Sequence, residues 1–269
     1  MAVSVSGTQA DPYIITTIEE FEDKASERGA YLKLANNIDL KNIVFNNGIN
    51  VNCTNIDGDG YAFLNPYIKN CLFIFTRKVV FNNFSIISFI VDGVESQNAK
   101  LFNNGYGAGG IEFHNCSLTG MFEGYGTLAS YGIEYYNSGL NLIFNDNSRM
   151  DDGGDYSRLY LNDSNVEIRG NTTGLLKSVL KNTYITGSIP NTYFTVSNLY
   201  GAHFSYYSIV DIETTKVESE SNTLTTLVNS SKISGTISEY LKPVTPEQLA
   251  KPECLSALGF PIETNQIGG

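Results

Sequence analysis

The chain repeats one pattern of apolar and polar positions along most of its length: an apolar residue, any residue, a small polar residue, then another apolar residue and often a glycine. Residues 113–120 and 180–187 are two clear copies. The other copies are residues 51–58, 81–86, 135–140, 161–170, 204–209 and 227–233. Copies spaced by roughly 19 to 32 residues indicate one short structural unit stacked many times.

Each copy contains a stretch that alternates with period two. Ile111, Phe113 and Asn115 alternate with Glu112 and His114. This alternation predicts a short strand that buries the first set of side chains and exposes the second. Phe, Tyr, Ile and Val, which favour strands, are abundant along the chain. The repeating unit is therefore predicted to consist of strands and not of helices.

The alternation slips after the small polar residue of each copy. The next apolar side chain, Leu118 in one copy and Ile185 in another, is then predicted to point inward from a second strand. Such a slip is typical of a corner between two strands. Asn and Ser suit corners, because their side chains bond to the local backbone and Asn tolerates a left-handed conformation.

A single strand cannot bury its face alone. Winding the chain so that each unit lies parallel to the previous one pairs every strand on both sides. Parallel connections between strands are right-handed. The sequence therefore predicts an all-β fold, a single-stranded right-handed parallel β-helix (a solenoid) that occupies residues 41–240, with a capping helix before it and a short helical segment after it.

Both ends of this body carry predicted covers. Residues 1–40 are predicted to form an N-terminal cap and a first strand unit, with Thr17 capping a helix that starts at Ile18 and stops near Gly29. Residues 31–40 alternate as the first unit. Residues 241–269 are predicted to form a helical or extended tail, in which Thr245 caps a helix and Pro246 takes its first position.

The charge balance narrows the range of partners. The chain of 269 residues has 17 basic and 28 acidic residues and a net charge of −11, which opposes binding to nucleic acid or to anionic membranes. Residues 1–7 lack a basic stretch followed by an apolar one, and no apolar run reaches the length of a membrane helix. We therefore expect no leader, no membrane insertion, and synthesis in the cytoplasm.

The four cysteines are predicted to be buried, reduced thiols. They are Cys53, Cys71, Cys116 and Cys254, and their spacing fits no metal-ligand pair. Two acidic turns, residues 57–60 and 151–155, contain clustered oxygens that calcium would accept, but their spacing is not that of a calcium loop. We interpret both segments as ordinary turns, and we predict no metal and no cofactor.

The opening of the chain resembles a known fold family. Residues 7–21, followed by residues 31–40, resemble the start of pectate-lyase-like right-handed β-helix proteins of phage virions and bacterial surface adhesins. Residues 244–249 and 258–262 are similar to the endings of tailed-phage structural proteins. The resemblance implies a virion location and partners among other virion proteins. It also implies that the chain forms a homo-oligomer, such as the trimers common among these viral proteins. It carries no catalytic residue onto this chain.

Stacking the copies predicts which outward side chains are neighbours. Counting three residues before the small polar position gives the row Asn50, Val80, Glu112, Glu134, Tyr160, Val179, His203 and Thr226. Counting one residue before it places His114 beside Tyr136. We therefore predict an outward surface patch made of Glu112, His114, Glu134 and Tyr136.

This patch allows several interpretations. Two neighbouring carboxylates, Glu112 and Glu134, would raise one pKa and could serve as an acid and a nucleophile. They could equally share a cation or a sugar hydroxyl, or be a solvent-exposed column without a role. Tyrosines 125, 131, 135, 136, 206 and 207 could stack on sugar rings or fill the interior.

We predict a protein without catalytic residues, because the chain has only two histidines and no recurrent cluster of charged residues on its strands. The expected role is a structural or adhesive component of a bacteriophage virion, in a tail, a fibre or a head decoration, with host cell-surface polysaccharide as a further expected partner. The alternatives are a polysaccharide lyase or glycosidase of a phage tailspike, and a bacterial surface adhesin.

Overall fold

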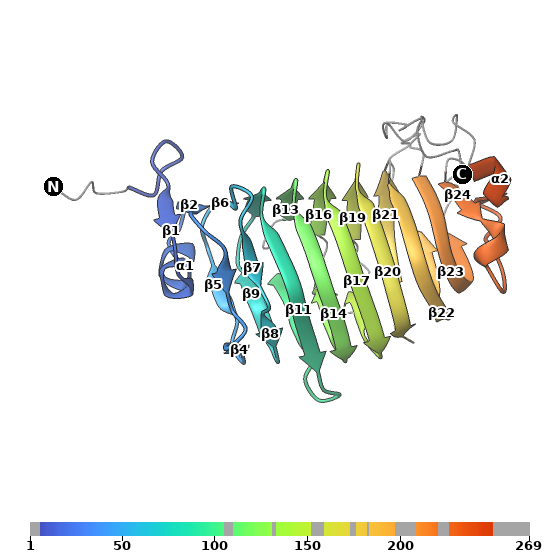
Figure 1. Cartoon of the computed structure of the whole chain (residues 1–269), viewed down its shortest axis with the longest axis horizontal. Coiled ribbons are helices and arrows are strands. Elements are labelled where there is room, and N and C mark those ends of the chain that lie inside the picture. The colour runs from blue at the N-terminus through green and yellow to red at the C-terminus, as the bar shows by residue number, and fades with distance from the viewer. Residues whose placement is uncertain are drawn as a thin grey trace, which may run out of the picture.

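The computed structural model describes residues 6–104, 110–130, 133–151, 159–172, 176–181, 183–196, 208–219 and 226–249. Strands dominate these residues, and the pairings between named strands are parallel. The strands lie side by side along an elongated molecule, with the helix α1 (Ile18–Ala25) near one end (Figure 1). The prediction of a mostly β fold with parallel sheets is confirmed.

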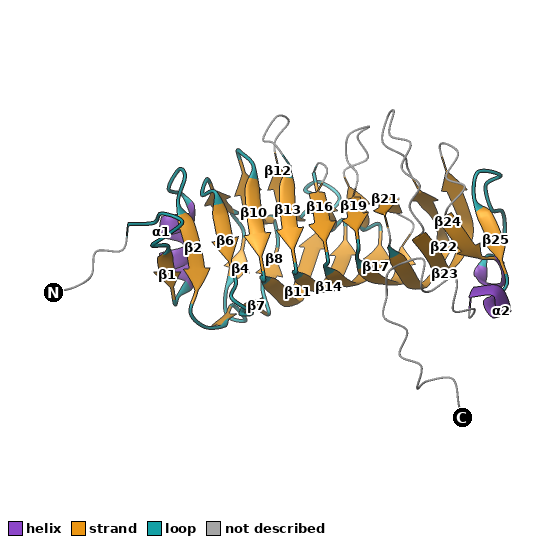
Figure 2. Cartoon of the chain, turned by 90° about the horizontal axis from the view of Figure 1, so that it is seen from above, coloured by secondary structure: helices purple, strands orange, loops and turns teal. Residues whose placement is uncertain are grey.

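Three series of strands run along the molecule, and we call them the first, second and third faces. The first face, which Figure 2 shows, consists of β1 (Tyr13–Ile15), β2 (Tyr31–Leu34), β6 (Asn55–Asp57), β10 (Val79–Asn82), β13 (Ile111–His114), β16 (Ile133–Tyr136), β19 (Leu159–Asn162) and β21 (Leu176–Lys181). The second face consists of β3 (Ile38–Asp39), β4 (Val44–Phe45), β7 (Ala62–Leu64), β8 (Tyr67–Ile68), β11 (Ser85–Gly93), β14 (Ser117–Gly124), β17 (Gly139–Asp146), β20 (Asn165–Thr172), β22 (Tyr184–Val196), β23 (Ser208–Ser219), β24 (Thr226–Asn229) and β25 (Lys242–Val244).

The third face consists of β5 (Ile49–Val51), β9 (Cys71–Phe75), β12 (Lys100–Asn104), β15 (Thr127–Ala129) and β18 (Arg149–Asp151). It forms a separate sheet of five strands, whereas hydrogen bonds join the first and second faces in a sheet of 20 strands. Each unit in the middle of the molecule thus contributes one strand to each face, in the same order.

Equivalent positions of successive units lie next to one another on the first face. Val80 pairs with Glu112, Glu112 with Glu134, and Glu134 with Tyr160. Tyr160 then pairs with Val179. This register is the one that the repeat predicted for these five units.

The predicted row is wrong at its two ends. Val80 pairs with Asn55 and not with Asn50, because the residues around Cys53 and those of β6 both alternate, and the pattern fits either stretch. Thr226 pairs with Ser208 on the second face, since β24 begins at the position that follows the corner in other units. The position predicted for residue 203 lies outside the described residues.

The corner between the first and second faces is built by left-handed residues. Asn83, Asn115, Asn137 and Asp163 have φ values of 49°, 54°, 48° and 50°, a region that Asn and Asp enter more readily than other non-glycine residues. The backbone N–H of Asn115 donates to the carbonyl oxygen of Tyr136 in the next unit at 3.0 Å. Asn115 is exposed, so the expectation that it points inward is wrong: the left-handed turn directs it to solvent.

The residue directly after the corner also points inward. Cys116 and Ser138 occupy this position in two units, and both are buried. The Ser138 hydroxyl accepts the backbone N–H of Cys116 at 3.1 Å and donates to the carbonyl oxygen of Tyr136 at 2.9 Å. The second strand then buries Leu118 and Ile185 completely, which confirms their predicted inward orientation.

Aromatic side chains stack along the core. The rings of Phe81, Phe113 and Tyr135 lie one above the other, with centroid distances of 4.6 and 4.9 Å. Phe122 and Phe144 form a second stack at 4.7 Å. Tyr135 is fully buried, and its hydroxyl oxygen has no hydrogen-bond partner. Of the two interpretations left open for Tyr135, the interior one is therefore confirmed.

Helix α1 begins where the sequence predicted. Thr17 is its N-cap, and Glu20 completes a capping box by accepting the backbone N–H of Thr17. The helix ends at Ala25 and does not extend to Gly29. Instead, the carbonyl oxygen of Ala25 accepts the backbone N–H of Cys53 at 3.0 Å.

The helix covers one end of the core. Phe21 is fully buried and packs against Phe63 and Phe73, with ring centroids 4.9 and 5.8 Å away. The predicted first unit at residues 31–40 is preceded by another strand, since Tyr13 in β1 pairs with Leu32 in β2. The first strand of the sheet is therefore β1.

The C-terminal elements are short. The 3₁₀ helix η1 (Ser230–Lys232) follows β24, and α2 (Pro246–Leu249) follows β25. Thr245 caps α2 reciprocally with Gln248: the Thr245 hydroxyl accepts the Gln248 N–H at 3.3 Å, and the Gln248 side chain accepts the Thr245 N–H at 2.8 Å. The cap and the proline at the first helical position were predicted; the rest of the predicted tail lies outside the described residues.

Three of the four cysteines lie in the described residues, and all three are buried free thiols. Burial raises the pKa of Cys53, Cys71 and Cys116 to about 12. The prediction of buried, reduced thiols is confirmed for these three, and Cys254 lies outside the described part. No helix among the described residues is long and apolar enough to cross a membrane.

Candidate functional site

The four residues predicted to form an outward patch lie together on the first face. Glu112 pairs with Glu134, and His114 pairs with Tyr136, in the adjacent strands β13 and β16. All four side chains are half-buried. The buried alternate residues of the same strands, such as Phe113, fix the outward direction of these four, because successive side chains of a strand point to opposite sides.

Direct contacts tie the patch into one unit. Glu112 forms an ion pair with Lys78, and its other oxygen, Oε2, lies 3.3 Å from Nε2 of His114. The Tyr136 hydroxyl donates a hydrogen bond to Glu134. The rings of His114 and Tyr136 are stacked, with centroids 4.6 Å apart and planes inclined by 5°.

The charges of the patch favour an ionised Glu112. Burial alone raises the pKa of Glu112, but the hydrogen bonds from Lys78 and His114 outweigh burial and lower it overall. The hydrogen bond to Glu134 raises the pKa of Tyr136, since an ionised phenol could not donate. A general acid needs a raised pKa, so Glu112 does not meet the requirement for the acid of a carboxylate pair.

Polar side chains continue on both sides of the patch. His114 pairs with Asn82, and Asn82 pairs with Asp57 on the N-terminal side. Tyr136 pairs with Asn162 on the C-terminal side. These side chains form an outward row across successive strands, and we call it the polar row.

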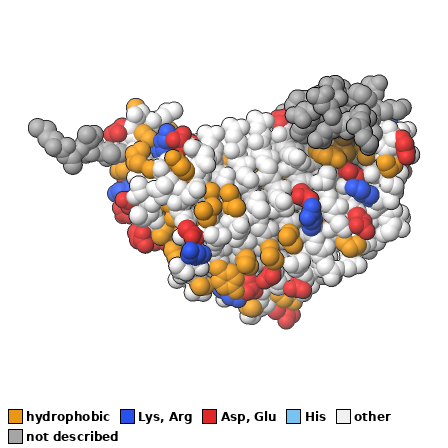
Figure 3. Space-filling view, in the orientation of Figure 1, with side chains coloured by type: hydrophobic (Ala, Val, Ile, Leu, Met, Phe, Trp, Pro, Cys, Tyr) orange, Lys and Arg blue, Asp and Glu red, His pale blue; other side chains and the backbone are white. Residues whose placement is uncertain are grey.

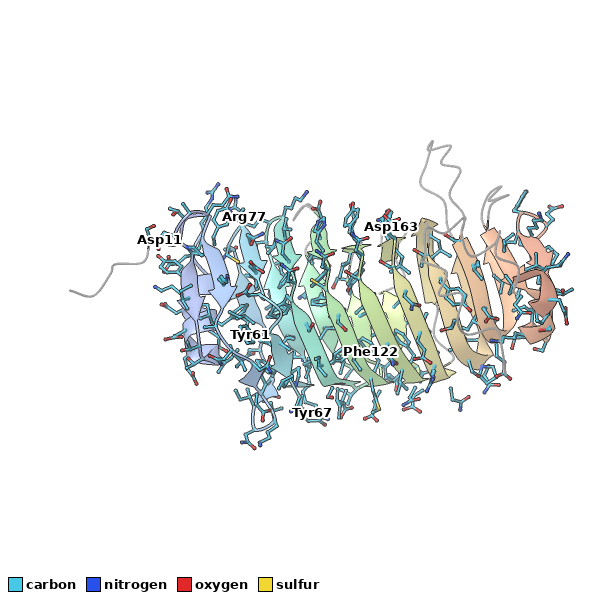
Figure 4. The ribbon with its side chains drawn as sticks, turned by 45° about the horizontal axis from the view of Figure 1, so that its top comes forward. Asp11, Tyr61, Tyr67, Arg77, Phe122 and Asp163 are labelled. Atoms are coloured by element: carbon cyan, nitrogen blue, oxygen red, sulfur yellow. The ribbon has the colours of Figure 1, made fainter. Side chains whose placement is uncertain are left out.

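A depression of about 250 Å³ lies at the N-terminal end of the polar row. Its floor is formed by β2, β6 and β10, and one wall is the turn before β1 that contains Asp11. Figure 4 shows Asp11 at the same edge of the molecule as Arg77 and Asp163. The residues that line the depression are Gln9, Pro12, Tyr31, Leu32, Lys33, Asn55, Asp57 and Asn82.

The acidic turns show no metal site in the part that the structure describes. Asp57 accepts the backbone N–H of Asp59 at 2.9 Å, and Asp59 forms an ion pair with Lys33 at 3.0 Å. No group of three His, Cys, Asp or Glu residues that could hold a metal occurs among the described residues. The second acidic turn lies outside them from residue 152 onward.

The structure places the predicted aromatic side chains differently from one another. Tyr136 is on the polar row, Tyr125 is half-buried, and Tyr135 is inside the core. Tyrosines 131, 206 and 207 lie outside the described residues. Tyr160, which was in the predicted row but not in the predicted patch, lies next to Glu134.

Sequence reasoning missed three parts of this site. The ion pair of Lys78 with Glu112 was not predicted. The available signal was that Val80 pairs with Glu112 and that Lys78 lies two residues before Val80. The depression was also missed, because Gln9 and Pro12 belong to a turn outside the repeat. The third part is Asp57, which continues the polar row from Asn82 and which the register error in that unit had concealed.

Comparisons with known proteins do not assign this chain. No family model matches it, and no curated protein matches it. Among solved structures, it is similar to the crystal structure of a "putative immunoglobulin A1 protease" from Bacteroides ovatus, at 14% identity and a TM-score of 0.46, over 93% of this chain and 88% of that one.

Proposed function

We propose that the chain is a right-handed parallel β-helix, a rod-shaped solenoid, and that it acts as a non-enzymatic structural or adhesive component of a bacteriophage virion. In this proposal the polar row on the first face binds glycan of the host cell surface. The observation that carries the proposal is the row of outward amide, carboxylate and aromatic side chains on successive parallel strands.

A stack of parallel strands suits such a role. Central strands such as β13 and β16 are hydrogen bonded to the strands before and after them, and the aromatic stacks fill the interior. Backbone hydrogen bonds on both sides leave little freedom for local motion. The side chains of the polar row are therefore held at fixed spacing, which lowers the entropic cost of binding an extended ligand.

The polar row has the chemistry that sugars require. Amides and carboxylates bond to hydroxyl groups, and aromatic rings pack against the apolar faces of sugar rings. Asn82, His114, Tyr136 and Asn162 supply these groups in sequence along the face. We place glycan binding here for that reason.

The absence of catalysis remains part of the proposal. Lys78 and His114 hold Glu112 in its ionised form, and Tyr136 occupies Glu134. A polysaccharide lyase or glycosidase is the competing function, because two carboxylates are neighbours. Incubation with bacterial capsular and plant acidic polysaccharides should yield no new reducing or unsaturated ends; product formation that a Glu134→Gln variant loses would overturn the proposal.

Binding is tested with immobilised polysaccharides of the candidate host. The wild-type chain should bind one of them, and Tyr136→Ala should weaken that binding. Asn141→Ala, an exposed change on β17 of the second face, is the matched control and should bind normally. Equal binding by the two variants would remove the polar row from the proposal.

The virion location rests on the resemblance of residues 7–21 and 31–40 to phage β-helix proteins. Mass spectrometry of purified particles should detect the chain together with other virion proteins. Recovery of the chain only in a bacterial surface fraction would favour the adhesin alternative.

Self-association is also part of the proposal, and a trimer is one form of it. An outward apolar row crosses the second face through Val44, Tyr67, Ile90, Met121 and Ile143, which are paired in that order. Val44 is 49% exposed, and Figure 3 shows hydrophobic side chains on this face. These five side chains carry no charge and the next residue of the row is Arg169, so like-charge repulsion between two copies of an acidic chain is weak there. Light scattering measures the state, and a monomer at all concentrations would contradict it.

A further inference from the structure

The depression at the N-terminal end of the polar row has features of a binding site of its own. We propose that it binds one neutral sugar residue, a hexose or an N-acetylhexosamine, of the glycan that the first face contacts. This inference rests on the proposed function and adds a subsite to it.

The size of the depression limits its ligand to a single ring. Its volume is about 250 Å³, below the ~300–1,000 Å³ of pockets that enclose drug-sized molecules. A neighbouring sugar must therefore lie outside the depression, on the open face.

The lining matches a hydroxylated ring. The amides of Gln9, Asn55 and Asn82 each carry donors and an acceptor, and a sugar hydroxyl likewise donates and accepts. Tyr31 and Pro12 supply apolar surface on the same lining, against which the C–H face of a sugar can pack.

The charges in the depression disfavour an anionic sugar. Its single ammonium group, on Lys33, is paired with Asp59 at 3.0 Å. Asp57 contributes a carboxylate that accepts the side-chain N–H of Asn83 at 3.2 Å. With a net charge of −11 on the chain, a uronate or sialate would meet repulsion without a free cation to bind.

The wall of the depression is held in place by hydrogen bonds. Thr8 and Asp11 bond to each other's backbone at 3.1 and 3.2 Å, and Asp11 accepts the Ser6 N–H at 2.9 Å. The N–H of Tyr31 donates to the carbonyl oxygen of Gly7 at 2.9 Å. The turn is thus fixed to β2, and a sugar can bind without ordering it first.

The depression adjoins the predicted patch. Asn82 lines the depression and pairs directly with His114 on the next strand. A glycan with one residue in the depression can therefore continue over His114 and Tyr136.

The test uses methyl glycosides as probes. Methyl β-D-galactopyranoside, methyl α-D-glucopyranoside and methyl N-acetyl-β-D-glucosaminide are titrated against the full chain by NMR, with D-galacturonate as the anionic comparison. At least one neutral glycoside should bind, and galacturonate should bind more weakly. Asn55→Ala should weaken the neutral probe about fivefold, as expected for one lost hydrogen bond.

Two further variants keep the outcome interpretable. Gln9→Ala changes an exposed side chain on the wall and should also weaken the probe, whereas Asn141→Ala on the second face should not. If polysaccharide binds and depends on Tyr136, but no methyl glycoside binds or both lining variants bind normally, the subsite is overturned while the proposed function stands. Tighter binding of galacturonate also overturns the subsite; loss of all glycan binding overturns both.

Discussion

Asn115 shows why the repeat places a small polar residue at the corner. Its φ of 54° lies in the left-handed region, which costs a residue with an ordinary side chain about 1–2 kcal/mol. Asn115→Ala should therefore lower the free energy of unfolding by about that amount, and Asn115→Gly by less. Urea denaturation measures both. Equal losses in the two variants would show that the backbone conformation is not the cause.

Glu112 should make stability depend on pH. Its folded-state pKa is lowered, so the stability it contributes is present at neutral pH and is lost as the pH falls through that lowered value. Lys78→Met should reduce the free energy of unfolding at pH 7 by no more than ~1 kcal/mol, since Lys78 is 56% exposed. The difference in free energy of unfolding between Lys78→Met and wild type should disappear as the pH falls below the ordinary glutamate pKa of 4.5. In a Glu112→Gln background, Lys78→Met should have no such pH-dependent effect; a persistent one would contradict the assignment.

Neighbouring residues of the patch were predictable where the repeat is regular. Glu112 and Glu134 were placed side by side because their units share one pattern and one spacing from the corner. Lys78 was not, because a long side chain reaches its partner from outside the strand. The inward position of Tyr135 and the outward position of Tyr136 follow from period two, although the two interpretations, sugar contact and interior position, were left open for both residues.

At the scale of the element, steric crowding in β22 explains why a glycine often ends the repeat. Gly187 has a φ of 127°, and a Cβ there would lie 1.7 Å from the carbonyl oxygen of Ile168 in the neighbouring strand. Gly187→Ala should therefore destabilise the chain by more than ~1 kcal/mol. Gly139 in β17 is the control, because a Cβ there meets nothing within 4 Å; Gly139→Ala should be neutral or stabilising. Thermal unfolding compares the two, and similar losses would rule out the steric cause.

Elements were predicted less well where two stretches fit the same pattern. Val51 and Cys53 alternate as β6 does, and both stretches precede a glycine or a polar residue, so the sequence could not choose between them. In the structure, β6 occupies this position of the first face, because its residues are hydrogen bonded to β2 on one side and to β10 on the other. Helix α1 had stronger local signals, Thr17 and Glu20 above all, and its start was predicted correctly.

At the scale of the whole molecule, the parallel sheets were predictable because the pattern of apolar and polar positions repeats along the chain. Each copy of the repeat predicts the same neighbouring positions in the copies before and after it. The depression was not predictable in this way. It exists because the turn before β1 folds against β2, β6 and β10, and such a contact between a non-repeating turn and the repeat leaves no periodic trace. Ligand specificity is expected to reside in non-repeating turns of this kind, since they vary without disturbing the strand pairing.

The three described thiols can report whether the units unfold together. Cys53, Cys71 and Cys116 are at most 3% exposed, and burial raises the pKa of each to about 12. Because the thiolate is the reactive form, a thiol reagent at pH 8 should leave all three unmodified in the native state. A Cys254→Ser variant keeps the fourth cysteine out of the readout.

Rising urea should expose the three thiols. In a stack, each unit is stabilised mainly by its interfaces with the neighbouring units. When these interfaces are strong, neighbouring units unfold together rather than one at a time. The aromatic stack continues from Phe81 through Phe113 to Tyr135 without a break, so we expect Cys71 and Cys116 to become reactive over the same urea range. Mass spectrometry of the labelled protein resolves each site. Modification of Cys116 at a lower urea concentration than Cys71 would mean that neighbouring strands open in succession, and that the molecule lacks the rigidity on which the proposed binding face depends.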